Sequence, residues 1–106
     1  MGVMVIGAYR PKEGKDDELL KLVREHVPLL RDLGFATPRP ALVMRSSEGV
    51  IVEVFEWASQ NKIDDAHENV QVAHMWKAFA DVCTYESLRN LPETEGQFAH
   101  FTPINV

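Results

Sequence analysis

The chain has 106 residues, the size of one small domain, and its composition is that of an ordinary globular protein. Its formal net charge of -5, without a cluster of Lys and Arg, argues against a nucleic-acid partner, which requires a basic patch. A single cysteine, Cys83, cannot form an internal disulfide, and the apolar runs are too short to cross a membrane, so we expect a cytoplasmic protein.

The first half of the chain predicts a strand, a helix and two further strands. Residues 3–9 are apolar on both alternating faces, which is typical of a strand that is covered on both sides. Apolar residues recur every three or four positions over residues 16–33, which predicts an amphipathic helix. Residues 41–45 and 50–57 predict two strands that are joined by a hairpin turn at residues 46–49.

The second half predicts a helical region with a break in its middle. Ser59 is a good N-cap for a helix over residues 60–83. The apolar stripes of its two parts are offset by roughly a third of a turn, so we expect a break near Asn69, which can itself cap the second part. Residues 84–91 can hold a short helical turn, and the alternating, aromatic residues 97–102 predict the last strand.

This order of elements predicts the fold class. Strand, helix, strand, strand, helix, strand is the order of a ferredoxin-like βαββαβ sandwich, an α+β fold, in one domain over residues 1–106. Its four-stranded antiparallel sheet would carry the helices on one face and leave the other face bare. A second copy of the chain is the simplest cover for that face, so we expect a homodimer that forms an α/β barrel.

Four stretches carry a family resemblance. They are Val52–Ser59, where the third strand leads into the second helical region, Ala66–Asn69, His74–Trp76 and the closing Phe98–Phe101. In these stretches, and in element order over nearly the whole chain, the sequence resembles the antibiotic-biosynthesis-monooxygenase-like (ABM-like) branch of the dimeric α/β-barrel superfamily. That superfamily includes cofactor-free quinone-forming monooxygenases, heme-degrading monooxygenases and isomerases, so the resemblance implies a fold more firmly than an activity.

The resemblance does not extend to heme degradation. The heme-degrading members use an Asn on the first strand, and a Trp and a His on the second helix. His74 matches the position of that His, but the Trp would fall near Asp64. The first strand offers Ile6, Gly7 and Ala8 where an Asn is required. We therefore expect neither heme nor another cofactor.

Two histidines are the candidate catalytic residues. His26 falls within the apolar arc of the first helix, so its ring should point at the sheet, either as a pocket residue or as a satisfied core histidine. His67 flanks the apolar stripe of the second helical region and should face the crevice between helix and sheet, unless it is a partly exposed boundary residue. His74 shares a side with Lys77 and Asp81, which predicts that it faces solvent.

The candidate substrate-binding residues are Tyr9, Glu53, Glu56 and Trp76. Glu53 and Glu56 lie on opposite faces of the third strand, so one of them must point toward the helices or the barrel interior. A carboxylate there requires a partner, and either histidine is suitable. Such a pair can act as acid and base, or it can be a structural ion pair. Tyr9 can add a phenol to the same crevice and Trp76 can line it, although both can equally be core residues.

The leading functional hypothesis is a cofactor-free monooxygenase or isomerase that acts on a small hydrophobic or aromatic molecule. His26 or His67 would then be a general base that removes a phenolic or α-carbon proton. As the resemblance implies, the resulting carbanion would meet oxygen in a dry cavity. Two alternatives stay open. One is a non-enzymatic dimeric ligand-binding or scaffold module, and the other is a metal site built from both histidines and a glutamate.

Overall fold

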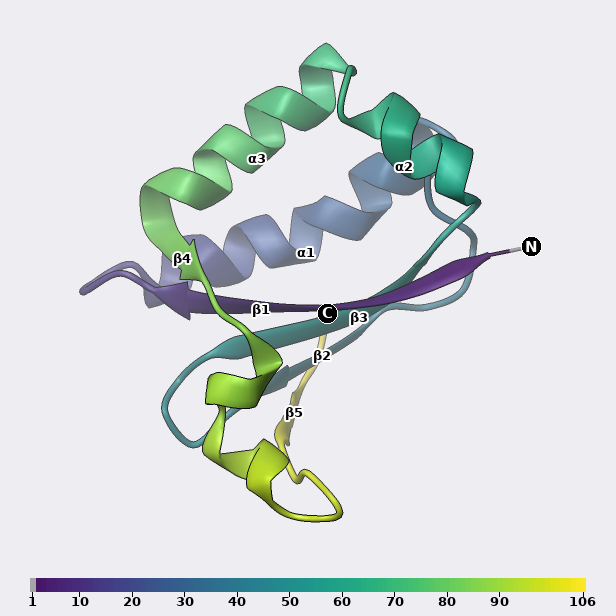
Figure 1. Ribbon diagram of the computed structural model, residues 1–106. Helices are drawn as coiled ribbons and strands as arrows, with labels where there is room; N and C mark the ends of the chain where they lie inside the picture. The colour runs from purple at the N-terminus through teal and green to yellow at the C-terminus, as the bar shows by residue number, and fades with distance from the viewer. Residues whose placement is uncertain (1) are drawn as a thin grey trace.

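One antiparallel sheet of five strands is the framework of the computed structural model, which describes residues 2–106 (Figure 1). In sheet order its strands are β4 (Cys83–Tyr85), β1 (Val3–Pro11), β3 (Ile51–Trp57), β2 (Leu42–Arg45) and β5 (Thr102–Ile104). The two longest and most apolar strands, β1 and β3, pair in the centre, with Gly7 opposite Glu53. Their odd-numbered residues share one face of the sheet, because side chains alternate along a strand.

Within the described part of the chain, three helices cover that face: α1 (Asp16–Asp32), α2 (Gln60–Ala66) and α3 (Val70–Val82) (Figure 1). The predicted amphipathic helix is confirmed in α1, whose buried residues include Leu19 and Leu30. Pro28, inside α1, is exposed, so its kink and missing N–H face away from the core. The general α+β class is therefore confirmed, with the helices layered on one side of the sheet.

The predicted break in the second helical region is also confirmed. The Ser59 hydroxyl accepts a hydrogen bond from the Lys62 amide at 3.1 Å and begins α2. The Asn69 side chain accepts one from the Val72 amide, also at 3.1 Å, and begins α3. Two capped helices can turn their apolar stripes independently, which one straight helix with this sequence could not do.

The opposite face of the sheet is only half covered. After β4 the chain forms two 3₁₀ turns, η1 (Leu88–Asn90) and η2 (Pro92–Glu95), on the side away from the helices (Figure 1). Between the turns, Leu91 is buried in one apolar cluster with Ala8 and Val52. The uncovered half exposes large apolar side chains. These are Met4 (53% exposed), Ile6 (51%) and Leu42 (65%).

The sequence prediction is wrong at the end of the sheet. Residues 2–106 contain five strands instead of four, and residues 97–102 do not form the last one. The fourth strand begins at Cys83, directly at the end of α3, where no Gly or Pro marks the change from helix to strand. Phe98, in the expected strand, is exposed, because its aromatic alternation finds no partner strand. The short helical turn expected after residue 84 is confirmed as η1.

Candidate functional site

A cavity of about 440 Å³ opens between the sheet and the helices. Its walls are mostly aromatic and come from both central strands, from α3 and from β4; the rings belong to Tyr9, Phe55, Trp57, Trp76, Phe79 and Tyr85. Val5, Gly7, His26 and His67 complete the lining. Of the residues that the structure describes, no Lys, Arg, Asp or Glu lines this cavity. An apolar cavity with a few polar atoms is the usual form of a small-molecule site.

Glu53 anchors two of the cavity's polar side chains. It is fully buried, and its Oε1 accepts a hydrogen bond of 2.7 Å from the Tyr9 hydroxyl. The same oxygen lies 2.9 Å from Nδ1 of His26, which is also buried. Oε2 has no hydrogen-bond partner among residues 2–106. An unpaired buried carboxylate is strongly destabilising, so both contacts to Oε1 help to hold Glu53 in place.

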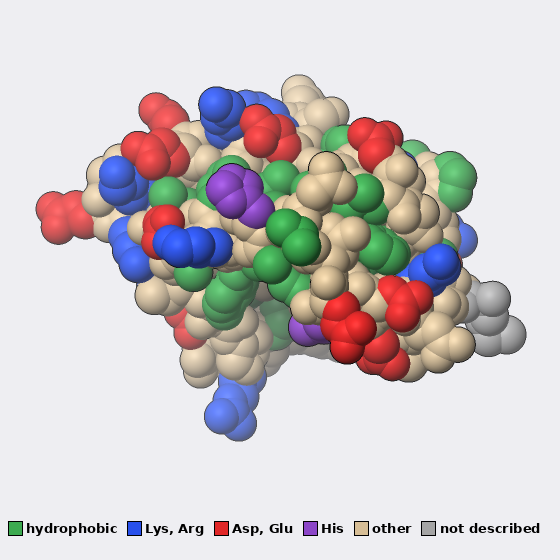
Figure 2. All heavy atoms as spheres, turned by 90° about the horizontal axis from the view of Figure 1, so that it is seen from above, with side chains coloured by type: hydrophobic (Ala, Val, Ile, Leu, Met, Phe, Trp, Pro, Cys, Tyr) green, Lys and Arg blue, Asp and Glu red, His purple; other side chains and the backbone are tan. Residues whose placement is uncertain are grey.

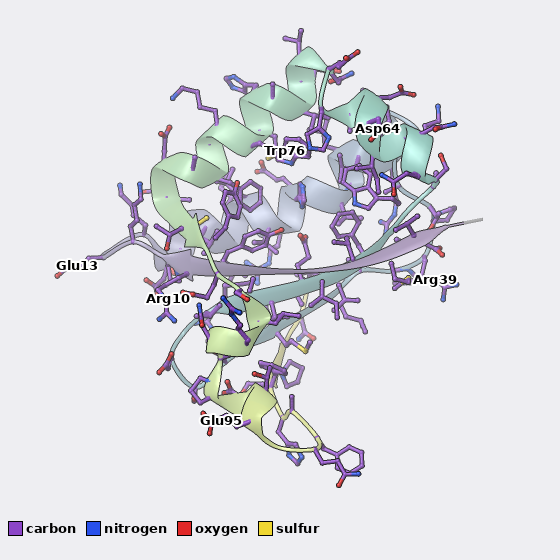
Figure 3. The ribbon with its side chains drawn as sticks, in the orientation of Figure 1. Arg10, Glu13, Arg39, Asp64, Trp76 and Glu95 are labelled. Carbon is purple, nitrogen blue, oxygen red and sulfur yellow. The ribbon has the colours of Figure 1, made fainter. Side chains whose placement is uncertain are left out.

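The contact of His26 with Trp76 shows which nitrogen carries the proton in the neutral imidazole ring. The Trp76 indole Nε1 lies 3.2 Å from His26 Nε2, and an indole nitrogen can only donate. Nε2 therefore accepts, which places the proton of the neutral ring on Nδ1, where it donates to Glu53. Figure 3 shows the Trp76 side chain extending from α3 into the space between the helices and the sheet. His26 thus lines the apolar cavity with a carboxylate bound to one ring nitrogen and the Trp76 N–H bound to the other.

Tyr9 is a donor to Glu53 instead of a free phenol in the cavity. Burial, reinforced by the negative charge of Glu53, raises the pKa of Tyr9 far above its ordinary value of 10.0, so its hydroxyl keeps its proton. Gly7 leaves room for this contact, because a Cβ at that position would lie 3.1 Å from the Tyr9 hydroxyl oxygen and crowd it. The missing side chain lets the phenol lean along β1 and reach the carboxylate opposite Gly7.

His67 lies at the rim of the cavity. Its side chain is exposed, and its ring packs edge-on against Trp76 with 4.9 Å between ring centroids. His67 Nδ1 lies 2.8 Å from the Ile63 carbonyl oxygen, which can only accept, so Nδ1 donates and, in the neutral ring, Nε2 is left as an acceptor. His74, in contrast, is exposed and does not line the cavity, as the helical periodicity predicts.

The structure brings together five of the six candidate residues, and Glu56 is the exception. Glu56 lies on the other face of β3, where it accepts hydrogen bonds from the Thr37 hydroxyl at 2.8 Å and from Arg39 at 3.1 Å. These bonds hold the pKa of the Glu56 carboxyl below its ordinary value. Its expected role in substrate binding is corrected accordingly, because alternation along the strand points it away from the cavity.

Six lining residues were not among the sequence candidates, and two of them, Gly7 and Tyr85, differ in the signal that they gave. Gly7 gave a usable signal, since a glycine inside an apolar strand often marks a close approach of another group. Tyr85 gave none, because it lies in β4, a strand that the sequence pattern does not reveal.

The described residues also bear on the metal-site alternative. Among residues 2–106, no three His, Cys, Asp or Glu side chains gather closely enough to hold a metal ion, so the metal-site alternative has no support. Within the same range, no helix has the length and apolar character needed to span a membrane. Acidic and basic side chains are interspersed on the helical face in Figure 2.

No protein-family model matches the chain, and no match was found among curated proteins or solved structures.

Proposed function

We propose that the protein binds a small aromatic or hydrophobic molecule in this cavity, and that His26 removes a proton from it. The pairing of His26 with Glu53 beside an apolar cavity carries this proposal. The carboxylate fixes the tautomer of the imidazole and stabilises the imidazolium that forms when Nε2 accepts a proton. Aromatic walls favour a flat, apolar ligand, and the absence of Lys and Arg from the described lining disfavours one that arrives as an anion.

Two reactions fit a general base in an apolar cavity. As an isomerase, His26 would return the proton to a different carbon of the ligand. As a cofactor-free monooxygenase, it would create a carbanion that combines with dioxygen. The imidazolium then returns its proton to give a hydroperoxide, and loss of water leaves a ketone. Dioxygen is thus the oxidant, with one of its atoms in the product and the other in water. The resemblance to the ABM-like branch supports this second reaction.

Oxygen uptake tests the role of His26. We would screen a panel of hydroquinones and anthrone-type arenes in an oxygen electrode with three proteins: wild type, His26→Gln, and His74→Gln as the matched control outside the cavity. We expect turnover by the wild type and by His74→Gln, and a loss of about 10²- to 10⁴-fold in His26→Gln, as is usual for removal of a general base. Full activity of His26→Gln on a substrate that the wild type turns over would contradict the proposal.

One observation favours a non-enzymatic binding module as the second candidate. The Trp76 N–H occupies the base nitrogen of His26, as it would if both side chains were structural. A binding module predicts that His26→Gln lowers the unfolding midpoint strongly and that no ligand is turned over. A catalytic His26 predicts instead that ligand binding largely survives the substitution while turnover is lost.

We further propose that the fold is a ferredoxin-like sandwich extended by β5, and that two copies pair through the uncovered half of the sheet. The order β4-β1-β3-β2, with the helices on one face, supports the fold. The exposed side chains of Ile6 and Leu42 support the pairing, since a second copy would bury them.

Light scattering of the purified protein tests the pairing. We expect a dimer for the wild type and a monomer for Ile6→Lys, because the new charge would be buried in the interface. Val70→Lys is the matched control: Val70 is 83% exposed, but it lies on the helical side. A monomeric wild type at micromolar concentration would contradict the dimer.

A further inference from the structure

The contact between Trp76 and His26 cannot persist when His26 acts as a base. The indole Nε1–H points at His26 Nε2 across 3.2 Å. Once Nε2 has accepted a proton, both nitrogen atoms are donors and neither can accept. Two donors at this distance repel each other, so proton transfer to His26 must separate the two side chains.

An anionic oxygen between the two donors resolves this conflict. Two charge-assisted hydrogen bonds of about 2.8 Å that meet at one oxygen, at an angle of about 110°, place their donor nitrogens about 4.6 Å apart. Trp76 and His26 would then have to move apart by about 1.4 Å from their observed separation. The cavity that both residues line, about 440 Å³ in volume, has room for the oxygen and for the ring that carries it.

Trp76 is the side chain that can move. His26 is held by its hydrogen bond to buried Glu53 and by edge-on contacts with the buried rings of Phe55 and Phe79, at centroid distances of 5.5 and 5.1 Å. Trp76 is only partly buried, and its edge-on neighbour His67 is exposed. Trp76 also packs against buried apolar residues of the core, but a shift of the indole breaks no hydrogen bond to a buried carboxylate, whereas a shift of the imidazole would break the bond to Glu53.

We infer that Trp76 is a second catalytic residue, which donates its indole N–H to the oxyanion formed when His26 deprotonates a neutral phenol or enol. This inference rests on the proposed function of His26. The O–H bond of the ligand breaks, its proton binds His26 Nε2, and the electron pair stays on oxygen. That oxygen then accepts hydrogen bonds from both the imidazolium and the indole. The Tyr9 hydroxyl is not available for this role, because it donates to Glu53.

The probe for this inference is 4-nitrophenol, whose neutral and ionised forms absorb at different wavelengths. At a pH below the pKa of the free probe, we expect the wild type to bind it as the anion. Trp76→Phe keeps a ring but removes the N–H donor, so we expect the anion to bind about 10- to 100-fold more weakly. Trp57→Phe is the matched control, because Trp57 lines the same cavity but makes no hydrogen bond to His26. We expect it to weaken binding much less.

A second ligand separates lost hydrogen bonding from lost packing. The methyl ether 4-nitroanisole cannot ionise, so Trp76→Phe should bind it at least as tightly as the wild type does. Replacement of Trp76 by benzothienylalanine, which has the shape of Trp without the N–H, should behave as Trp76→Phe does, and it serves if the Phe variant fails to fold.

The outcomes separate the two proposals. Equal affinity of Trp76→Phe and Trp57→Phe for the anion would overturn the role of Trp76 and leave His26 as the base. Equal loss of both ligands in Trp76→Phe would also overturn it, because the residue would then only shape the cavity. Binding of 4-nitrophenol to the wild type only in its neutral form, or not at all, would overturn both the Trp76 inference and the proposed function.

Discussion

Replacement of Tyr9 by Phe is the sharpest test of how Glu53 is held. The Tyr9 hydroxyl supplies one of the two hydrogen bonds to the Glu53 carboxylate, whose Oε2 has no partner among the described residues. The aromatic ring is retained in the variant, so its packing against Phe79 at a centroid distance of 5.1 Å is kept. A hydrogen bond to a charged group contributes about 1.5–3 kcal/mol, and we expect Tyr9→Phe to lower the free energy of unfolding by about 2 kcal/mol.

Urea denaturation followed by circular dichroism measures this loss. The urea dependence of the unfolding free energy is about 1–3 kcal/mol per molar for small proteins, so the midpoint should fall by about 1 M. Tyr85→Phe is the matched control, because Tyr85 is exposed and packs edge-on against Tyr9 without a hydrogen bond to Glu53. We expect this control to lie within about 0.5 kcal/mol of the wild type.

A double-mutant cycle shows whether the charge of Glu53 matters. In a Glu53→Gln background the amide oxygen can still accept from Tyr9, but the bond is neutral, and Tyr9→Phe should cost only about 1 kcal/mol. Equal losses in the two backgrounds would refute the view that the phenol stabilises a buried carboxylate. A loss no larger than that of Tyr85→Phe would refute the contact itself.

Three further predictions concern the supports of the fold and the site. Hydrogen bonds from Arg10 and Asn90 hold the pKa of the Glu86 carboxyl below its ordinary value of 4.5, so its ionised form adds stability that is lost as the pH falls through the lowered pKa. Arg10→Met should therefore destabilise the protein near neutral pH and have a smaller effect in strong acid, which urea midpoints at both pH values measure. Asn69→Ala should cost about 1 kcal/mol in thermal unfolding because it removes the cap of α3, whereas Asn69→Gly should cost only a few tenths. Gly7→Ala should cost about 1 kcal/mol by crowding the phenol, and a loss just as large in a Tyr9→Phe background would contradict this reason.

Periodicity located the parts of the site that depend on one element. The apolar arc of α1 placed His26 against the sheet, and alternation along β3 placed Glu53 and Glu56 on opposite faces. Alternation does not say which face the helices cover, so only the assembled sheet identifies Glu53 as the inner carboxylate. The bond between Trp76 and His26 joins residues 50 positions apart, and no local pattern predicts such a contact between α1 and α3.

The errors at the C-terminal end have a physical cause as well. A strand is recognised in sequence by apolar alternation and by flanking turn residues. β4 has only three residues, which is too short for either signal. It is fixed by pairing with β1, with Tyr85 opposite Tyr9, which is a tertiary interaction. β5 contains Pro103, a residue that argues against a strand in sequence but is tolerated at the edge of a sheet.

These short edge strands also bear on aggregation. An exposed sheet edge offers unpaired backbone groups to which a strand from another molecule can add. β4 and β5 are only three residues long, about 10 Å of backbone, and Pro103 lacks an amide proton to donate. Such edges are poor templates for fibril growth. However, β4 pairs with β1 only over residues 9–11, so residues 3–7 of β1 also lie at the edge of the sheet. A strand from another molecule should therefore add along this part of β1, and not along β4 or β5.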